Sequence, residues 1–594
     1  MTTTKHPPHM GTMSQVPFNL SFLLNRGYKI QPNNQIIEKT ETGYYSLTYL
    51  QHQARVCQLA NALTKHGVKR GDRVGTFCWN TNRHLQAFHA VPSMGSVLHP
   101  LNIRLGPTEL AFIIGDADDK LCIVDQDLLD RFAEVSVEGL KPLEYGVIVC
   151  GPVPGDTAPH WRNNPSAKIL KEKLGNRPLL DYDEFIAKYN NNNNSGSTNS
   201  FPWPNDIDEN AACTFCYTSG TTGNPKGVAY SHRSQFVMTI AMQAKDVHNI
   251  GGADVVLPVV PYFHANGWGL PHLVLALGAR VLHNGRYTDP DTTLQMASDH
   301  GATYSAAVPA VWQTVRARLE AEPEKYKNRF KIQGILCGGS APSNEMMKWY
   351  LDNWNVRFRQ GWGMTETGPL GTTGTAQATY KHSQQSEEDQ FGNVTLAGIP
   401  ALGVQLKIVD SEDFSIDLPN DGEAQGELLV KGPWVTIRYY NRYDENATKN
   451  FTKDGWLATG DIASITENGA LIIRDRSKDV IKSGGEWISS IDLENHIVAL
   501  PYISQCAVVA QPHPKWDERP VVIAILSDSN EGENILDKVR DHCSSMFAKY
   551  ELPDEVLVWD DLPVTGTGKI SKKDIRNRLE SEGYMLPDLR QNKL

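Results

Sequence analysis

The sequence predicts an α/β protein with more than one domain, and three observations lead to this fold class. At 594 residues the chain is too long for one compact core, while a hydrophobic content of 40% is ample for burial. From Ser46 onward, segments with apolar residues at helical spacing alternate with short apolar runs. This alternation is typical of parallel sheets with helices on their faces.

The predicted elements can be followed along the first part of the chain. Apolar residues at helical spacing predict a helix that ends at Gly67: Val56, Leu59, Ala60 and Leu63. Further helices are predicted from Asn82 and, after Pro107, over 110–114. The short apolar runs between them are predicted strands: 73–78, 97–101 and 121–124.

A domain boundary is predicted between residues 475 and 476. Residues 1–475 would form a large N-terminal domain, in which short β-like runs become frequent over 426–473. Residues 476–594 would form a small α+β C-terminal domain, because they contain strands and a helix of their own: 507–510, 521–526 and 535–547. Two polar segments, 190–200 and 374–392, are predicted to be solvated loops.

Composition excludes several classes of protein. The 57 basic and 68 acidic residues give a net charge of −11 without a basic stripe, which argues against nucleic acid as a partner. Nine cysteines without framework spacing indicate a reducing compartment. The polar N-terminus lacks the apolar core of a signal peptide, and the longest apolar run, 268–282, is interrupted and too short for a transmembrane segment.

A loop rich in glycine and hydroxyl groups follows the apolar run 211–217. Glycines let backbone amides approach an anion, hydroxyls donate to phosphate oxygens, and a lysine adds positive charge. The pattern therefore predicts a phosphate cradle, although the same residue types also form flexible surface loops. It is not a Walker loop, because glycine rather than serine or threonine follows the lysine. The cradle residues are Thr218, Ser219, Gly220, Thr221, Thr222, Gly223, Asn224, Pro225 and Lys226.

A second glycine-framed segment places a carboxylate beside a hydroxyl. Mg²⁺ in phosphate sites takes one or two protein carboxylates together with phosphate oxygens. Glu366 is the predicted metal ligand, and Thr365 would contact a phosphate. The segment consists of Gln360, Gly361, Trp362, Gly363, Met364, Thr365 and Glu366.

These two segments resemble motifs of the adenylate-forming (AMP-binding) superfamily, which holds acyl-CoA synthetases, luciferases and the adenylation domains of peptide synthetases. Four further segments resemble the family's other motifs and occur in the family's order: 337–342, 456–461, 474–488 and 562–570. The resemblance covers roughly residues 45–575, and 483–490 is most similar to the medium- and long-chain fatty-acid–CoA ligase branch. It implies a β-barrel-like subdomain in the N-terminal domain and a mobile C-terminal domain.

The resemblance implies a site for ATP. Gly339, Ser340 and Ala341 would form one wall of the adenine site, with Trp362 stacked on the base in place of the family's frequent tyrosine. The nucleotide would also contact Asp461 and Arg476 through its ribose, and Lys226 through its pyrophosphate. Thr218 and Glu366 would hold Mg²⁺. Taken alone, Asp461 fits an exposed turn equally well.

The resemblance also implies roles in catalysis and coenzyme A binding. Lys569 matches the catalytic lysine, His264 lies at the carboxylate pocket, and Trp268 would gate the acyl tunnel. Without the family context, these would be a solubilising charge, a loop histidine and a core aromatic. Lys478 matches the hinge between the domains. The segment after it would contact the nucleotide through Lys482 and Trp487 and the pantetheine arm through Gly484 and Gly485.

The predicted function is an AMP-forming acyl-CoA ligase that converts a medium- or long-chain fatty acid to acyl-AMP and then to acyl-CoA. A branched or secondary-metabolite acid, a luciferase-like activity and a non-catalytic adenylate-binding protein are the alternatives. A peptide-synthetase module is disfavoured by the short segment after Lys569. The C-terminal Asn592-Lys593-Leu594 resembles a peroxisomal import signal, so a peroxisomal location and contact with an import receptor are predicted. A cytoplasmic location is the alternative. A homodimer is compatible with the resemblance.

Overall fold

The computed structural model describes residues 13–14, 16–188, 200–218, 224–374, 396–443, 448–484, 486–527, 534–565 and 569–584. Several predictions concern residues outside these ranges: both polar loops for most of their length, Ser219, Gly220, Thr221, Thr222, Gly223, Gly485, Asn592, Lys593 and Leu594. Within the described ranges, no helix combines the length and the apolar character needed to cross a bilayer.

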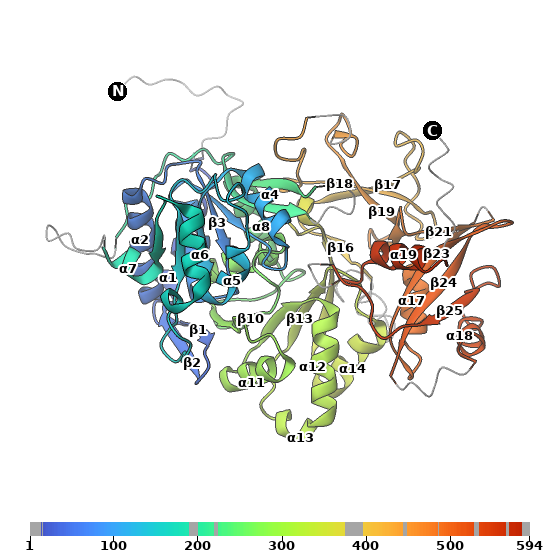
Figure 1. Ribbon diagram of the computed structural model, residues 1–594. Coiled ribbons are helices and arrows are strands. Elements are labelled where there is room, and N and C mark those ends of the chain that lie inside the picture. Colours follow the sequence, from blue (N-terminus) through green and yellow to red (C-terminus); the bar gives the residue numbers. More distant parts are fainter. Residues whose placement is uncertain are drawn as a thin grey trace.

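Two large sheets form the body of the N-terminal domain (Figure 1). The seven-stranded sheet has the order β7-β6-β5-β3-β4-β8-β9 and is parallel except for β9. Its strands are β3 (Arg73–Phe77), β4 (Val97–Pro100), β5 (Asp119–Asp125), β6 (Val147–Cys150), β7 (Leu179–Asp181), β8 (Ala212–Thr218) and β9 (Lys226–Ser231).

The nine-stranded sheet is mixed, with the order β16-β15-β14-β13-β12-β10-β11-β1-β2. Its central strands are parallel, and both edges are antiparallel. The strands are β1 (Gln35–Lys39), β2 (Tyr44–Thr48), β10 (Val255–Pro258), β11 (Arg280–His283), β12 (Tyr304–Ala307), β13 (Gly334–Gly338), β14 (Arg357–Trp362), β15 (Thr372–Thr373) and β16 (Ile399–Pro400).

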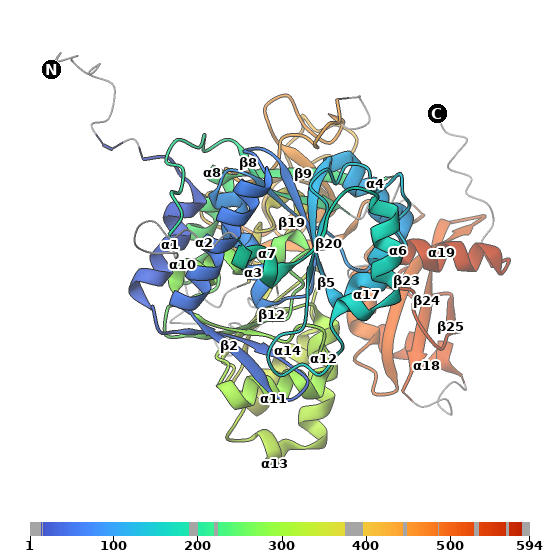
Figure 2. The same ribbon diagram turned by 60° about the vertical axis from the view of Figure 1, so that its left-hand side comes forward.

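Helices cover both sheets in layers. One hydrophobic core lies between the sheets and includes helices that stand close together in Figure 2: α1 (Leu20–Ile30), α2 (Tyr49–His66), α3 (Asn82–Ser93), α7 (Tyr182–Lys188), α8 (His232–Met242) and α10 (Leu270–Leu277). The outer face of the seven-stranded sheet packs against η1 (Gln126–Leu128), α4 (Pro107–Ala117), α5 (Leu129–Ala133), η2 (Trp161–Asn163) and α6 (Pro165–Leu174). The outer face of the nine-stranded sheet packs against α11 (Pro290–His300), α12 (Pro309–Ala321), α13 (Pro323–Tyr326) and α14 (Asn344–Trp354).

Helix α2 illustrates how the sequence sets these elements. The Thr48 hydroxyl accepts a hydrogen bond from the backbone N–H of Gln51, whose side chain accepts one from the Thr48 N–H in return. This capping box satisfies two backbone donors that the helix leaves open. The helix ends at Gly67, where a φ of 110° favours glycine. The helix therefore ends at the residue predicted from the sequence, Gly67.

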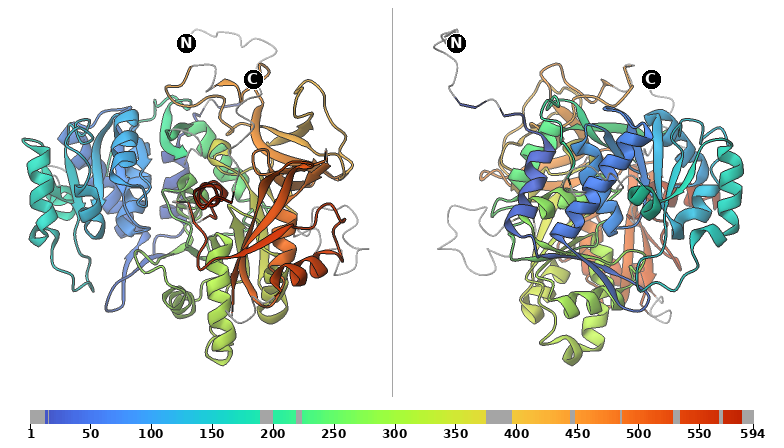
Figure 3. Two further views of the ribbon diagram at one scale, coloured as in Figure 1. Left: turned by 45° about the vertical axis from the view of Figure 1, so that its right-hand side comes forward. Right: turned by 90° about the vertical axis from the view of Figure 1, so that its left-hand side faces the viewer.

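The last part of the N-terminal domain is an antiparallel four-stranded sheet of β17 (Gln405–Val409), β18 (Gly426–Lys431), β19 (Leu457–Ile465) and β20 (Leu471–Arg476). The C-terminal domain follows with a five-stranded sheet of β21 (Ile481–Ser483), β22 (Glu486–Ile488), β23 (Ile503–His513), β24 (Asp517–Leu526) and β25 (Glu555–Val558). Its helices are α17 (Ser490–Ile497), α18 (Ile535–Cys543) and α19 (Lys572–Ser581). In Figure 3 (left), the C-terminal domain lies on the opposite side of the green central elements from the blue seven-stranded sheet.

The predicted α/β fold class, with a large N-terminal and a small C-terminal domain, is confirmed. The segment connecting the two final sheets runs from Arg476 to Ile481, next to the predicted boundary. All nine cysteines are buried thiols, distributed over both domains: Cys57, Cys78, Cys122, Cys150, Cys213, Cys216, Cys337, Cys506 and Cys543.

Candidate active site

A large cavity of about 1100 Å³ lies between the two domains. Its walls are formed by the carboxyl ends of strands in the nine-stranded sheet, by the β8–β9 hairpin and by residues of the C-terminal domain. Predicted site residues that are far apart in the sequence meet there: Thr218, Lys226, His264, Trp268, Gly339, Ser340, Gly361, Trp362, Gly363, Met364, Thr365, Glu366, Arg476, Lys478 and Lys569.

The phosphate end of the cavity is built on the hairpin. Strands β8 and β9 are antiparallel, and Thr218 pairs with Lys226 across them. The five cradle residues between β8 and Asn224 lie outside the described ranges. Both Thr218 and Asn224 line the cavity, and Lys226 places its ammonium 4.7 Å from the centre of the Tyr439 ring. Pro225, the remaining predicted cradle residue, does not line the cavity.

Glu366 is the buried carboxylate of this end. It lies in the short helix η3 (Thr365–Thr367), is 5% exposed, and accepts a 2.7 Å hydrogen bond from the Tyr439 hydroxyl. Burial raises the pKa of Glu366, while the bond from Tyr439 and the charges of Arg476 and Lys226 act in the opposite direction. Magnesium prefers oxygen ligands, and this carboxylate lines the cavity together with the Thr218 and Thr365 side chains. The donor set therefore fits Mg²⁺.

Asp461 is held by two neighbours in the predicted ribose site. Its Oδ1 lies 2.8 Å from Arg476 Nε, and its Oδ2 accepts a 2.9 Å hydrogen bond from the Trp362 indole N–H. The side chain is buried at 2% exposure. Trp362 thus has a polar contact that the sequence did not predict, because its N–H donates to the carboxylate of the predicted ribose ligand.

The predicted adenine wall is formed by the turn after β13. Gly339 has a φ of +87°, a conformation that favours glycine, and Ser340 follows it on the cavity wall. Among the residues predicted to contact the adenine and the ribose, three do not line the cavity: Ala341, Gln360 and Asp461. Gln360 pairs with Cys337, which packs in the core on the outer face of the sheet. The next pair, Gly338 and Gly361, faces the cavity, because successive residues of a strand alternate between the two faces.

The predicted acyl end of the cavity begins at an unusual turn after β10. Residues 265–269 all have left-handed backbone angles, including Ala265 at φ 35° and Trp268 at φ 52°. Such conformations are costly for residues with a side chain and persist only where the surroundings impose them. The turn places Trp268 against Gly338, where an added Cβ would be 3.4 Å from the indole. Burial, with the charges of Lys569 and Arg104, lowers the pKa of the adjacent His264 to about 3, so its imidazole is neutral.

Lys569 enters the cavity from the C-terminal domain. A Cβ on Gly339 would lie 3.2 Å from the Lys569 Cε, so the lysine stem crosses the predicted adenine wall. Its backbone is held by Thr565, whose N–H donates to the Lys569 carbonyl at 2.7 Å. Burial and the positive charge of Arg476 lower the pKa of Lys569 to about 8. The two domains therefore meet with this lysine inside the site.

The hairpin β21–β22 does not take part in this arrangement. Lys482 stacks 5.3 Å from the centre of the Trp487 ring, and neither residue lines the cavity; nor does Gly484. Gly484 has a φ of +63° and packs against Trp516. By contrast, the predicted hinge residue Lys478 lines the cavity from the connection between the domains.

Sequence reasoning missed several residues of the site. Tyr439, which holds Glu366, follows β18 in a segment without a recognised motif; its only signal was the aromatic pair Tyr439-Tyr440. Arg442 also lines the cavity and forms an ion pair of 2.8 Å with Asp116. His248 lines the cavity from the loop after α8 and gave no sequence signal.

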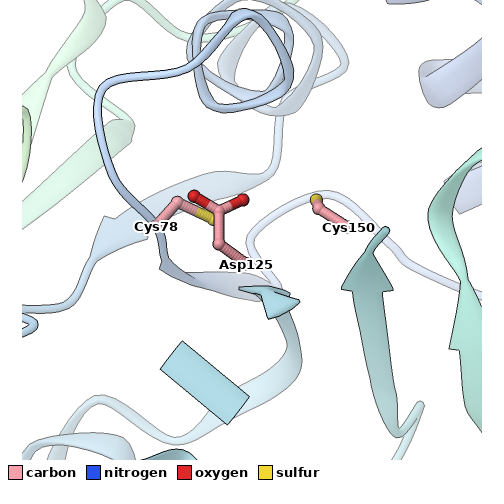
Figure 4. Close-up of side chains that lie close together, drawn as sticks. All are labelled: Cys78, Asp125 and Cys150. Carbon is pink, nitrogen blue, oxygen red and sulfur yellow. The ribbon is translucent and has the colours of Figure 1, made fainter. Parts of the chain in front are cut away.

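A separate group of potential ligands lies outside the cavity (Figure 4). Cys78, Asp125 and Cys150 follow or end the neighbouring strands β3, β5 and β6, and their ligand atoms lie within 4.8 Å of one another. Burial raises the pKa of Asp125 to about 7 and that of Cys78 well above its usual range. In neutral solution the Cys78 thiol is therefore protonated and Asp125 is only partly ionised. Thiols do not suit Mg²⁺, so Glu366 rather than this group stays the candidate magnesium ligand.

Comparison with known proteins agrees with this geometry. Residues 28–440 match the AMP-binding enzyme family, and residues 492–569 match the AMP-binding enzyme C-terminal domain. The chain belongs to the AMP-binding enzyme family. It is an ATP-dependent acid–CoA ligase of the AMP-forming kind.

Individual relatives cover nearly the whole chain. It is 36% identical to the 3-methylmercaptopropionyl-CoA ligase of Ruegeria lacuscaerulensis over 96% of this chain and 99% of that one. It is also 36% identical to a medium-chain-fatty-acid–CoA ligase of Ectopseudomonas oleovorans over 89% of each chain. In fold it is similar to the anthranilate CoA ligase AuaEII in complex with anthranoyl-AMP, with a TM-score of 0.80, 21% identity and coverage of 96% and 99%.

Proposed function

We propose that this ligase activates an aliphatic carboxylic acid of medium or long chain, first to its acyl-adenylate and then to its coenzyme A thioester. The side chains on the acyl side of the cavity support an aliphatic acid, since most of them are apolar: Met242, Phe263, Trp268, Leu336 and Leu370. Relatives at 35–36% identity named for medium-chain and long-chain fatty acids support the same class.

In the first half-reaction a carboxylate oxygen of the acid attacks the α-phosphorus of ATP, and pyrophosphate leaves. Both reactants are anions, so the site must bring like charges together and neutralise them. Lys226 would hold the leaving pyrophosphate, and Lys569 would bridge the carboxylate and the α-phosphate. The neutral imidazole of His264 would orient the carboxylate, while Asp461 and Arg476 would hold the ribose.

Glu366 and Thr218 would hold Mg²⁺, which when bound supplies positive charge to the phosphate oxygens. The Tyr439 hydroxyl fixes one oxygen of Glu366 and leaves the other for the metal. Glu366 is therefore positioned by a residue more than seventy positions away in the sequence.

In the second half-reaction the thiolate of coenzyme A attacks the acyl carbon, and AMP leaves. We propose that residues 476–594 turn relative to residues 1–475 about Lys478 between the two steps. This movement would withdraw Lys569 and bring the segment of Lys482, Gly484, Gly485 and Trp487 to the cavity. It would also limit hydrolysis of the acyl-adenylate, a reactive mixed anhydride, because the domains would enclose the cavity and exclude water in each of the two steps.

The position of Lys569 inside the cavity is the observation that carries this proposal, and Lys569→Ala tests it. Pyrophosphate release should fall about a hundred- to a thousand-fold, because the variant lacks a charge that stabilises the transition state. Thioester formation from supplied acyl-adenylate should be largely kept. Lys549→Ala is the control, since Lys549 is an exposed lysine of the same domain. Equal loss of both half-reactions would contradict the two-arrangement mechanism.

We further propose that the C-terminal tripeptide directs the protein to peroxisomes. The benzoate–CoA ligase of Arabidopsis thaliana, at 29% identity, is named as peroxisomal, which supports the proposal. Deleting Asn592-Lys593-Leu594 from a fluorescent fusion should abolish punctate import in a eukaryotic cell; unchanged diffuse fluorescence with and without the tripeptide would reject it.

A further inference from the structure

Three potential metal ligands meet at one edge of the seven-stranded sheet, outside the active-site cavity (Figure 4). Cys78 follows β3, Asp125 ends β5 and Cys150 ends β6. These strands are parallel in the order β6-β5-β3, so their carboxyl ends lie at the same edge, where open α/β sheets bind ligands. The two Sγ atoms and a carboxylate oxygen lie within 4.8 Å of one another, and all three residues are buried.

The ligand types and their spacing suit a zinc ion. Zinc binds thiolate sulfur at about 2.3 Å and carboxylate oxygen at about 2.0–2.2 Å, usually in a tetrahedron. Two ligand atoms of such a tetrahedron are about 3.5–3.8 Å apart. The present spacing therefore has to contract by at most about 1.3 Å to reach it. Two sulfur ligands also favour zinc over Mg²⁺ and Ca²⁺, which prefer oxygen.

A second cavity, of about 40 Å³, adjoins the three side chains and has room for a further ligand. Asp125 and Cys150 line it, together with Trp79, which follows Cys78 in the chain. The volume is sufficient for a water molecule, and zinc with three protein ligands takes water in its fourth position. The backbone N–H of Trp79 donates to Asp125 Oδ2 at 2.9 Å and so orients the carboxylate. Among the described residues Oδ1 has no hydrogen-bond partner, so this oxygen is left for the metal.

A buried arginine would balance the charge of the complex. Two thiolates and one carboxylate around Zn²⁺ leave one negative charge. The Arg83 guanidinium donates to the carbonyl of Gly151, the residue after Cys150, at 2.9 Å. Arg83 shares the carboxylate of Asp183 with Arg55, so this group of three keeps one positive charge. Burial raises the pKa of Cys150 while the charge of Arg83 acts in the opposite direction, toward the thiolate that a metal needs.

We propose that Cys78, Asp125 and Cys150 bind one zinc ion, with water as the fourth ligand. The second cavity is also lined by Lys39 at the end of β1 and by Arg286 after β11, so the ion would lie where the two large sheets meet. Only the folded chain brings the three ligands together, so zinc would stabilise the N-terminal domain by binding to the native state. The site is separate from the proposed Mg²⁺ and ATP site and takes no part in the ligase reaction.

The test measures zinc binding by the full-length protein after reduction and removal of metals with a chelator. The wild type should bind one equivalent of Zn²⁺ with a dissociation constant below about 1 μM, determined by competition with a chromogenic chelator. Zinc should raise the midpoint of thermal unfolding by at least about 2 °C. X-ray absorption at the zinc edge should show two sulfur neighbours at about 2.3 Å, with oxygen as the remaining ligand.

Variants locate the bound ion. Cys78→Ala and Cys150→Ala should each weaken zinc binding at least about a hundred-fold. Cys122→Ala is the matched control and should bind zinc like the wild type, because Cys122 is a fully buried thiol of β5 that packs in the core on the outer face of the sheet.

Three results would overturn the proposal: a wild type that binds no zinc, equal binding by all three variants, or a zinc spectrum without sulfur neighbours. A disulfide between Cys78 and Cys150, together with a reduced protein that binds no zinc, would also overturn it. Should Cys78→Ala or Cys150→Ala fail to fold, the sulfur count of the wild-type spectrum decides.

Discussion

Lys569 carries the clearest pH dependence of the site. Its lowered pKa, about 8, means that the free enzyme loses the ammonium as the pH rises through that value. The proposed first half-reaction needs the charged form, so kcat/KM for ATP in pyrophosphate release should fall above about pH 8. Lys569→Arg should abolish this fall, although its absolute rate is lower, because a guanidinium stays charged. A wild-type profile that is flat from pH 7 to about 10 would contradict the assigned role. At this scale the sequence predicted residues inside motifs, such as Glu366, Asp461 and Lys569, and missed Tyr439 and His248. Tyr439 reaches Glu366, and His248 reaches the cavity wall, through contacts between distant segments, which local residue patterns do not encode.

At the scale of single elements, the left-handed turn at 265–269 sets the position of Trp268 on the cavity wall. Gly267 has a φ of +58°, and a Cβ there would lie 2.7 Å from the Tyr262 ring. Gly267→Ala should therefore lower the stability of the fold by at least about 1–2 kcal/mol, measured by denaturant unfolding, and raise the KM for the acid by displacing Trp268. Gly115→Ala is the control: Gly115 lies in α4 with nothing within 4 Å of an added Cβ, so this variant should be neutral or slightly stabilising. An unchanged KM for Gly267→Ala would show that the turn does not position Trp268. The alternation of helices and strands was predictable from periodicity, as for α2, whereas this turn was not, because its angles are imposed by packing.

At the scale of the whole molecule, the connection between the final two sheets is the proposed pivot between the two half-reactions. Lys478→Pro should slow thioester formation from supplied acyl-adenylate while leaving pyrophosphate release largely intact, since proline fixes the φ angle at the proposed hinge. Lys478→Ala, which removes the side chain but keeps backbone freedom, should retain both half-reactions. Equal rates for the two variants in the second half-reaction would place the pivot elsewhere. The sequence predicted two domains and a boundary beside β20, because β-rich and α+β segments differ in pattern. It could not predict that the lysine loop would lie inside the cavity, which depends on how the domains are oriented.

The buried cysteines allow the unfolding of each domain to be measured by thiol modification. Seven lie in the N-terminal domain, from Cys57 to Cys337, and two, Cys506 and Cys543, lie in the C-terminal domain. A thiol reagent can reach a buried cysteine only when the surrounding core opens. The rates at which the cysteines of the two domains are modified therefore report the unfolding of each domain separately. Rigid rotation of one domain against the other should leave the thiols inside the hydrophobic cores covered. These are Cys78, Cys122, Cys150, Cys213 and Cys337 in the N-terminal domain and Cys543 in the C-terminal domain. A measurement of overall shape would not separate rotation of a domain from unfolding of a domain. The set of modified cysteines does separate them.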